Sequence, residues 1–153
     1  TVSLLAPAVR TGLFKRMLAP HIGRDIGSLA LFTMKQRDEL RDNVLMIYRK
    51  SLLYFLRNAC EDPPYSTAIL GLEESVRADP ELLALFGLAG APGPAQAIWS
   101  PTSEHAGRDA SQARSHSAFD EDRQTMDAVI RRILGLDDAA GLPAPHPGRP
   151  QPR

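Results

Sequence analysis

The chain has 153 residues, 43% of them hydrophobic and 24% charged, and its formal net charge is zero, which is typical of one globular domain with a modest core. Arginines scattered among acids argue against a nucleic-acid partner. No apolar run approaches the roughly 18 to 20 residues of a membrane-spanning helix. The single cysteine, Cys60, excludes an internal disulfide and a multi-cysteine zinc site, and it fits a cytoplasmic location. No motif predicts a cofactor or a bound metal ion.

The first apolar run, residues 2–6, has the length of a buried strand. It follows neither a methionine nor a leader, so we expect the sequence to be cut from a longer polypeptide. Thr11 is a candidate N-cap for a short amphipathic helix over residues 13–18, which Pro20 should end.

The second apolar run, residues 29–34, has apolar side chains on both faces, as in the middle strand of a helix-covered parallel sheet. A polar loop over residues 35–43 should follow it. Residues 44–60 predict the longest helix. Its apolar stripe should be core and comprises Tyr48, Leu52 and Phe55. We expect Cys60 to be a small buried hydrophobe and Arg57 to lie on a solvated edge.

Shorter elements follow along the chain. Residues 69–77 predict a weak helix, and the pair Asp79-Pro80 predicts the N-cap and first residue of another that stops at Gly87. Residues 97–99 predict a brief strand. The polar residues 102–115 predict an irregular loop that leads to a histidine.

The clearest helix pattern begins after Asp120, a candidate N-cap, and ends at Gly135, a candidate C-cap. Its apolar residues have the spacing of one helical face, which predicts that this face packs on a core. They are Met126, Val129, Ile130, Ile133 and Leu134. We expect one domain over residues 1–138, followed by a disordered proline-rich tail over residues 139–153.

The order of strands and helices predicts an α/β fold with a parallel sheet. In such sheets functional groups gather at the carboxyl ends of strands. Two loops follow strands here, residues 35–43, which carry several carboxylates, and residues 102–119, which contain His105 and His116.

An acid followed by a histidine matches the second half of a nucleophile, acid and histidine triad, in which the carboxylate orients the imidazole that acts as general base. His116 is the candidate base, while His105 is expected to be solvated. Asp38 is the first candidate acid, four residues past its strand. Asp42 is the second, although it could cap the next helix, and Glu39 remains a third.

A series of short segments carries a family resemblance: Leu5–Ala8, Leu31–Thr33, Arg41–Asn43, Ile47–Tyr54, Ile69–Glu73 and Ser115–Asp120. Together they resemble bacterial α/β-hydrolase-fold proteins of undefined substrate, over about residues 2 to 135. The resemblance implies the carboxyl-terminal part of such a fold, a mostly parallel sheet flanked by helices, with a helical excursion between the acid and histidine strands. Where the family favours His-Gly-Gly-Phe, this chain has His-Ser-Ala-Phe from His116, which reduces backbone freedom beside the histidine.

The sequence contains no G-x-S-x-G nucleophile elbow. The resemblance therefore implies that the serine lies upstream of this chain, which would be inactive alone. Our first hypothesis is a serine hydrolase acting on a small-molecule ester, amide or acyl substrate, with residues 44–87 forming a lid or acyl pocket. The alternative is a non-catalytic α/β domain that binds a partner with the same surface.

Overall fold

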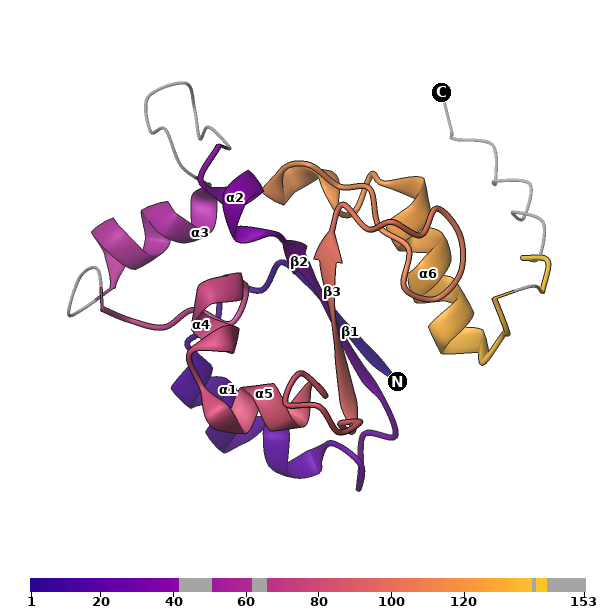
Figure 1. The fold of residues 1–153 in the computed structure, drawn as a ribbon, viewed down its shortest axis with the longest axis horizontal. Coiled ribbons are helices and arrows are strands. Elements are labelled where there is room, and N and C mark those ends of the chain that lie inside the picture. Colours follow the sequence, from indigo (N-terminus) through magenta and orange to yellow (C-terminus); the bar gives the residue numbers. More distant parts are fainter. Residues whose placement is uncertain (42–50, 62–65, 139, 143–153) are drawn as a thin grey trace, which may run out of the picture.

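The computed structural model describes residues 1–41, 51–61, 66–138 and 140–142 (Figure 1). Within these ranges the elements are, in chain order, β1 (Val2–Leu5), α1 (Thr11–Met17), η1 (Ala19–His21), β2 (Leu29–Met34), α2 (Gln36–Glu39), α3 (Leu52–Phe55), η2 (Leu56–Cys60), α4 (Glu73–Arg77), α5 (Pro80–Leu85), β3 (Ala95–Ser100), η3 (His116–Ala118) and α6 (Arg123–Leu134). Here η1 and η3 are 3-10 helices and η2 is a π-helix.

The three described strands form one parallel sheet in the order β1-β2-β3. The register pairs Val2 with Leu29 and Leu29 with Ala95. All six residues of β2 are buried, because helices cover both faces of the sheet. The predicted α/β class and the predicted middle strand are therefore confirmed.

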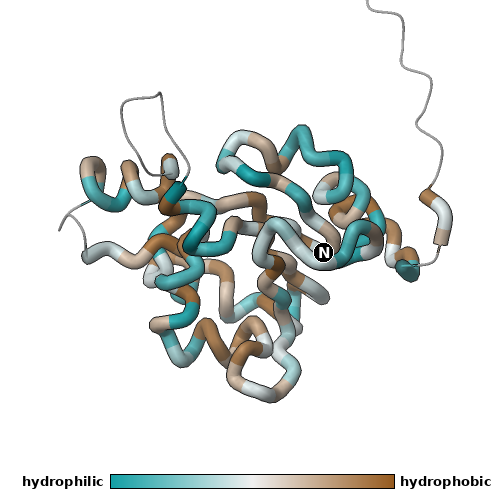
Figure 2. The backbone as a smooth tube through the Cα atoms, turned by 45° about the horizontal axis from the view of Figure 1, so that its top comes forward, coloured by the Kyte–Doolittle hydropathy of each residue, from teal (hydrophilic) through white to brown (hydrophobic). Residues whose placement is uncertain are grey.

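The core is divided by the sheet into two layers. Leu29 and Leu31 pack with Phe14 and Leu82 in one hydrophobic cluster, whereas Phe32 and its neighbours on the other face pack in a second. This separation follows from the alternation of side chains along a strand. Figure 1 shows α1, α4 and α5 on one side of the sheet and α6 on the other. Brown and teal residues alternate along these helices (Figure 2), as in helices that cover a sheet with one face.

Two predicted helix starts are wrong. Thr11 is the first residue of α1, and Arg10 is its N-cap. Arg10 forms a β-bridge with Ile69, and this pairing carries the extended conformation up to Arg10. At α6 the N-cap is Asp122 instead of Asp120, because its carboxylate accepts the backbone N–H of Thr125 at 3.0 Å.

The end of α6 is as predicted, because Gly135 adopts the left-handed conformation with φ of 65°. Its packing face is only partly as predicted, since Val129 alone of the predicted residues, all of which the structure describes, packs against the core cluster on that side of the sheet. The buried residues are Thr125, Ala128 and Arg132, while Ile133 is 66% exposed. Thr125 and Ala128 are small enough for a close approach to the sheet, and the buried Arg132 donates hydrogen bonds to Gln96 and to the carbonyl of Arg108.

Only part of the long predicted helix can be compared, since residues 44–50, and with them Tyr48, lie outside the described ranges. The described part is α3 followed by η2, whose wider turn moves side chains off the expected stripe. Leu53 is buried, whereas Phe55 is 37% exposed. Cys60 is exposed, so the expectation that it is buried is wrong.

Arg57 also differs from the expected solvated edge. Its side chain is 18% exposed and forms an ion pair with Glu74, and its guanidinium carbon lies 4.6 Å from the centroid of the Tyr54 ring. The predicted edge therefore contributes to packing between η2 and α4.

The remaining elements agree more closely with those predicted from the sequence. Asp79 caps α5 as predicted, and β3 extends the predicted brief strand at both ends. A short helix, α2, forms where a loop was expected. Of the predicted tail, residues 139 and 143–153 are outside the described part of the chain. No helix among the described residues is long and apolar enough to cross a membrane.

Candidate active site at the carboxyl end of the sheet

The segments that leave β2 and β3 are joined at the carboxyl end of the sheet. Lys35, directly after β2, donates its backbone N–H to the carbonyl of Ser100 at 3.0 Å. Its ammonium group donates a hydrogen bond to the carbonyl of Pro101. Because the strands are parallel, α2 and the loop after β3 start from the same edge (Figure 1).

Asp38 lies on α2, and its side chain is 21% exposed. Its carboxylate pairs with Arg37 at 3.4 Å. No hydrogen bond joins Asp38 to His116, both of which the structure describes. Asp42, the second candidate acid, lies outside the described residues.

Glu39 is the next residue of α2, and it is completely buried. Its backbone carbonyl accepts the N–H of Ser51 at 3.0 Å, which ties α2 to the start of α3. A buried carboxylate is rare unless it is paired or functional. In the sequence Glu39 was only the third candidate acid, after Asp38 and Asp42. A run of charged residues does not indicate which of its side chains the fold will bury.

His116 begins η3, the short 3-10 turn that follows the loop after β3. The residue is half-buried, and its Nδ1 atom is buried from solvent. Phe119, three residues later, is 2% exposed and packs in the same cluster as Met34, the last residue of β2. This anchor brings η3 to the end of the sheet at which α2 begins. The fold therefore gathers the histidine loop and the carboxylates of α2 at one edge.

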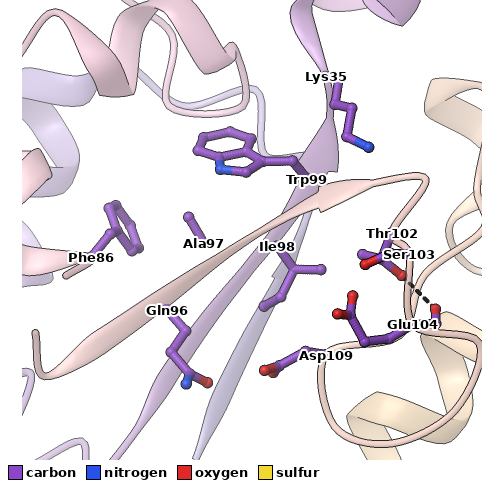
Figure 3. A pocket seen from close by; sticks show the side chains of 10 residues that line it. All are labelled: Lys35, Phe86, Gln96, Ala97, Ile98, Trp99, Thr102, Ser103, Glu104 and Asp109. Carbon is purple, nitrogen blue, oxygen red and sulfur yellow. Dashed lines mark hydrogen bonds between the residues drawn. The ribbon is translucent and has the colours of Figure 1, made fainter. Parts of the chain in front are cut away.

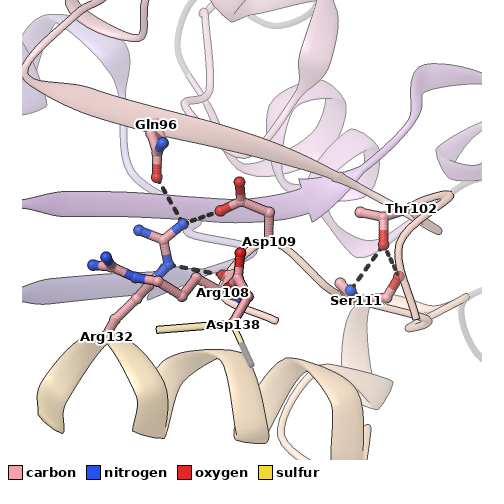
Figure 4. A network of polar contacts seen from close by, with 7 residues as sticks. All are labelled: Gln96, Thr102, Arg108, Asp109, Ser111, Arg132 and Asp138. Atoms are coloured by element: carbon pink, nitrogen blue, oxygen red, sulfur yellow. Dashed lines mark hydrogen bonds and ion pairs between the residues drawn. The ribbon is translucent and has the colours of Figure 1, made fainter. Parts of the chain in front are cut away.

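The loop between β3 and His116 is irregular, as expected, but it is held by hydrogen bonds. The hydroxyl of Thr102 accepts the backbone N–H of Ser111 at 3.1 Å and lies 3.2 Å from the carbonyl oxygen of Ser111 (Figure 4). The backbone N–H of Thr102 donates to the same carbonyl at 2.9 Å. His105 lies between Thr102 and Ser111 in the sequence, and its side chain is exposed. His105 is therefore solvated, as predicted.

Helix α6 is tied to β3 by a second polar network (Figure 4). Arg132 is 4% exposed and donates to Gln96 at 2.7 Å and to the carbonyl of Arg108 at 2.9 Å. It also forms an ion pair with Asp109. Burial lowers the pKa of Arg132, and the charge of Asp109 opposes this effect.

A cavity of about 330 Å³ lies along β3 (Figure 3). Polar and charged side chains contribute much of its lining, among them Lys35, Thr102, Ser103, Glu104 and Asp109. Trp99 lines it as well, and the guanidinium carbon of Arg77 lies 5.4 Å from the centroid of the indole ring. None of the candidate acids and bases described above lines this cavity, so it is a separate feature.

Asp122 was not a candidate site residue in the sequence, yet its carboxylate caps α6 and also accepts the backbone N–H of Gln112 at 2.8 Å. The signal was present, because an aspartate three residues before Thr125 fits an N-cap as well as Asp120 does. Among the described residues, no three His, Cys, Asp or Glu side chains gather in a metal-binding arrangement. Comparisons with models of protein families, with curated proteins and with solved structures found no match to this chain.

Proposed function

We propose that this chain supplies the acid and the histidine of a serine hydrolase of the α/β-hydrolase type, which acts on an ester, amide or acyl substrate. The nucleophilic serine would come from outside these 153 residues, because the sequence has no nucleophile elbow. One observation carries the proposal. The strands are parallel and in chain order, with carboxylates directly after β2 and a histidine after β3 at the same edge.

The burial of one ring nitrogen, Nδ1 of His116, supports the role of this residue as general base. In a triad, Nδ1 faces the buried acid while Nε2 takes the proton of the nucleophile. His116 keeps Nδ1 away from solvent although the residue is only half-buried. With Nδ1 directed into the protein, the imidazole has the orientation that a triad base requires.

Burial also bears on the choice of acid. A triad carboxylate is buried, and Glu39 is more deeply buried than Asp38. Asp38 stays in the proposal because hydrogen bonds of catalytic groups are often long in the absence of substrate. Asp42 stays in it as the third candidate.

The test is hydrolysis of an activated p-nitrophenyl ester, with labelling by a fluorophosphonate probe, in the natural protein that contains this chain. His116→Ala should lower kcat by roughly 10³-fold or more, and His105→Ala, in the same long loop, should leave it unchanged. Among Asp38→Asn, Glu39→Gln and Asp42→Asn, the most damaging substitution identifies the acid. Full activity in His116→Ala would refute the proposal.

A non-catalytic function in partner binding is the second candidate, and one observation favours it. Large apolar side chains are exposed on helices of both sides of the sheet, including Leu13 and Met17 of α1 and Ile133 of α6. Exposed apolar patches are typical of protein interfaces. A natural protein that neither hydrolyses esters nor reacts with the fluorophosphonate would support this function instead.

A further inference from the structure

The loop that carries His116 is closed at its base by a single carboxylate. Asp122 accepts the backbone N–H of Gln112 on Oδ2 at 2.8 Å. The same oxygen accepts the backbone N–H of Thr125 at 3.0 Å and its hydroxyl at 2.6 Å. Asp122 thus holds together the two ends of the segment on which the histidine lies, and it caps α6 at the same time.

A chain of buried hydroxyl groups connects this carboxylate to the sheet. The hydroxyls of Thr125 and Ser111 are 2.7 Å apart, and that of Ser111 donates to Ser100 at 2.9 Å. Ser100, the last residue of β3, donates to the carbonyl of Ala113 at 2.6 Å. All three hydroxyl residues are 0% exposed. Buried hydrogen bonds therefore attach the base of the loop to the end of β3.

The carboxylate is held in its charged form. Burial opposes ionisation of Asp122, but hydrogen bonds from Thr125 and from the amide of Gln112 outweigh it and keep its pKa below the ordinary value. A charged acceptor forms stronger hydrogen bonds than a neutral one.

We propose that Asp122 is a positioning residue for His116, acting through the loop that it closes between Gln112 and Thr125. This inference rests on the proposed function. A general base must be held within hydrogen-bond reach of its proton, and a displacement of about 1 Å can cost roughly 10²-fold in rate. Asp122 touches neither the substrate nor the reacting atoms, so its effect is on geometry.

The test compares Asp122→Ala with Asp127→Ala in the natural protein. Asp127 is the matched control because it is an aspartate of the same helix, α6, and its carboxylate pairs with Arg123 one turn away at 3.7 Å instead of closing the histidine loop. Asp122→Ala should lower kcat roughly 10- to 100-fold with unchanged KM, while Asp127→Ala leaves both unchanged. Asp122→Asn should recover most of the rate, since its amide oxygen can accept the same N–H groups. Retention of kcat within about twofold in Asp122→Ala would overturn the proposal.

A second measurement does not depend on activity. The ring signals of His116 in a nuclear magnetic resonance spectrum should shift or broaden in Asp122→Ala and stay in place in Asp127→Ala. If the unmodified protein hydrolyses no ester, the proposed function fails and this measurement alone decides whether Asp122 positions the ring. Unchanged His116 signals in a folded Asp122→Ala protein would overturn the positioning role in either case.

Discussion

Arg132 of α6 and Gln96 of β3 are joined by a hydrogen bond of 2.7 Å between Nη2 and Oε1, although they lie 36 residues apart in the chain. The bond aligns the helix that follows the histidine loop with the strand that precedes it. Arg132 is also the charged residue on the face of α6 that packs toward the sheet. The polar contacts of this one side chain therefore help to set the position of α6.

The first prediction is that Arg132→Ala lowers the free energy of unfolding by about 2 to 4 kcal/mol, because removal of a side chain that is 4% exposed leaves a gap between α6 and the sheet, and the carbonyl of Arg108 loses a donor. Urea unfolding measures the change. Arg123→Ala is the control on the same helix, since its side chain is 92% exposed and its removal should cost no more than about 0.5 kcal/mol. Equal losses in the two variants would contradict a stabilising role for the Arg132 network.

The second prediction concerns Gly71, which packs against the turn after β1. A Cβ atom there would lie 2.6 Å from Cδ1 of Leu53 and 2.7 Å from the carbonyl oxygen of Pro7. Gly71→Ala should destabilise the protein by about 1 to 3 kcal/mol. Gly12→Ala, in α1, has open space around the new methyl group and should stabilise by up to about 1 kcal/mol. Thermal unfolding of both variants checks the opposite signs.

The third prediction is a pH dependence at Asp79. Burial opposes its ionisation, but Lys15 and the amides of Leu82 and Glu81 keep its pKa below the ordinary value. The stability that it contributes is therefore present above the unfolded pKa of about 3.9 and is lost as the pH falls through the folded value. Asp79→Ala should cost about 1 kcal/mol at neutral pH, and the difference should shrink in urea unfolding at acidic pH. A difference that stays constant down to low pH would contradict the assignment.

The fourth prediction concerns the alkaline side. Burial and the nearby Glu74 raise the pKa of Tyr54 to about 12. The pKa of Tyr54 in the folded protein therefore lies above the unfolded value of about 10. The stability that the neutral Tyr54 contributes is complete below a pH of about 10 and is lost as the pH rises toward the folded pKa. Absorbance of the tyrosinate ion should show one late titration that Tyr54→Phe removes. The same variant should also lose less stability than the unmodified protein between these two pH values, and equal losses would contradict the prediction.

Several features of the fold followed from local patterns. The strand at residues 29–34 was predicted because five of its six residues are apolar and lie on both faces of a strand, so both faces must be buried. The cap at Asp79 was predicted because an aspartate before a proline can accept the free backbone N–H groups of the first helical turn, which are only two and three residues away. These features depend on interactions that are close in sequence, so the sequence by itself determined them and the parallel α/β order that they imply.

The tertiary structure decided which face of α6 packs, which aspartate caps it and which carboxylate of α2 is buried. The sequence pattern favoured Ile133 for the core, yet Arg132 is buried there because Asp109 and Gln96, from distant segments, supply its acceptors. Glu39 and Asp38 are neighbours in sequence, and only the packing of α2 against the rest of the chain separates them. The cost of burying a polar or charged group is set by the partners it meets, and those partners are known only once distant parts of the chain are brought together.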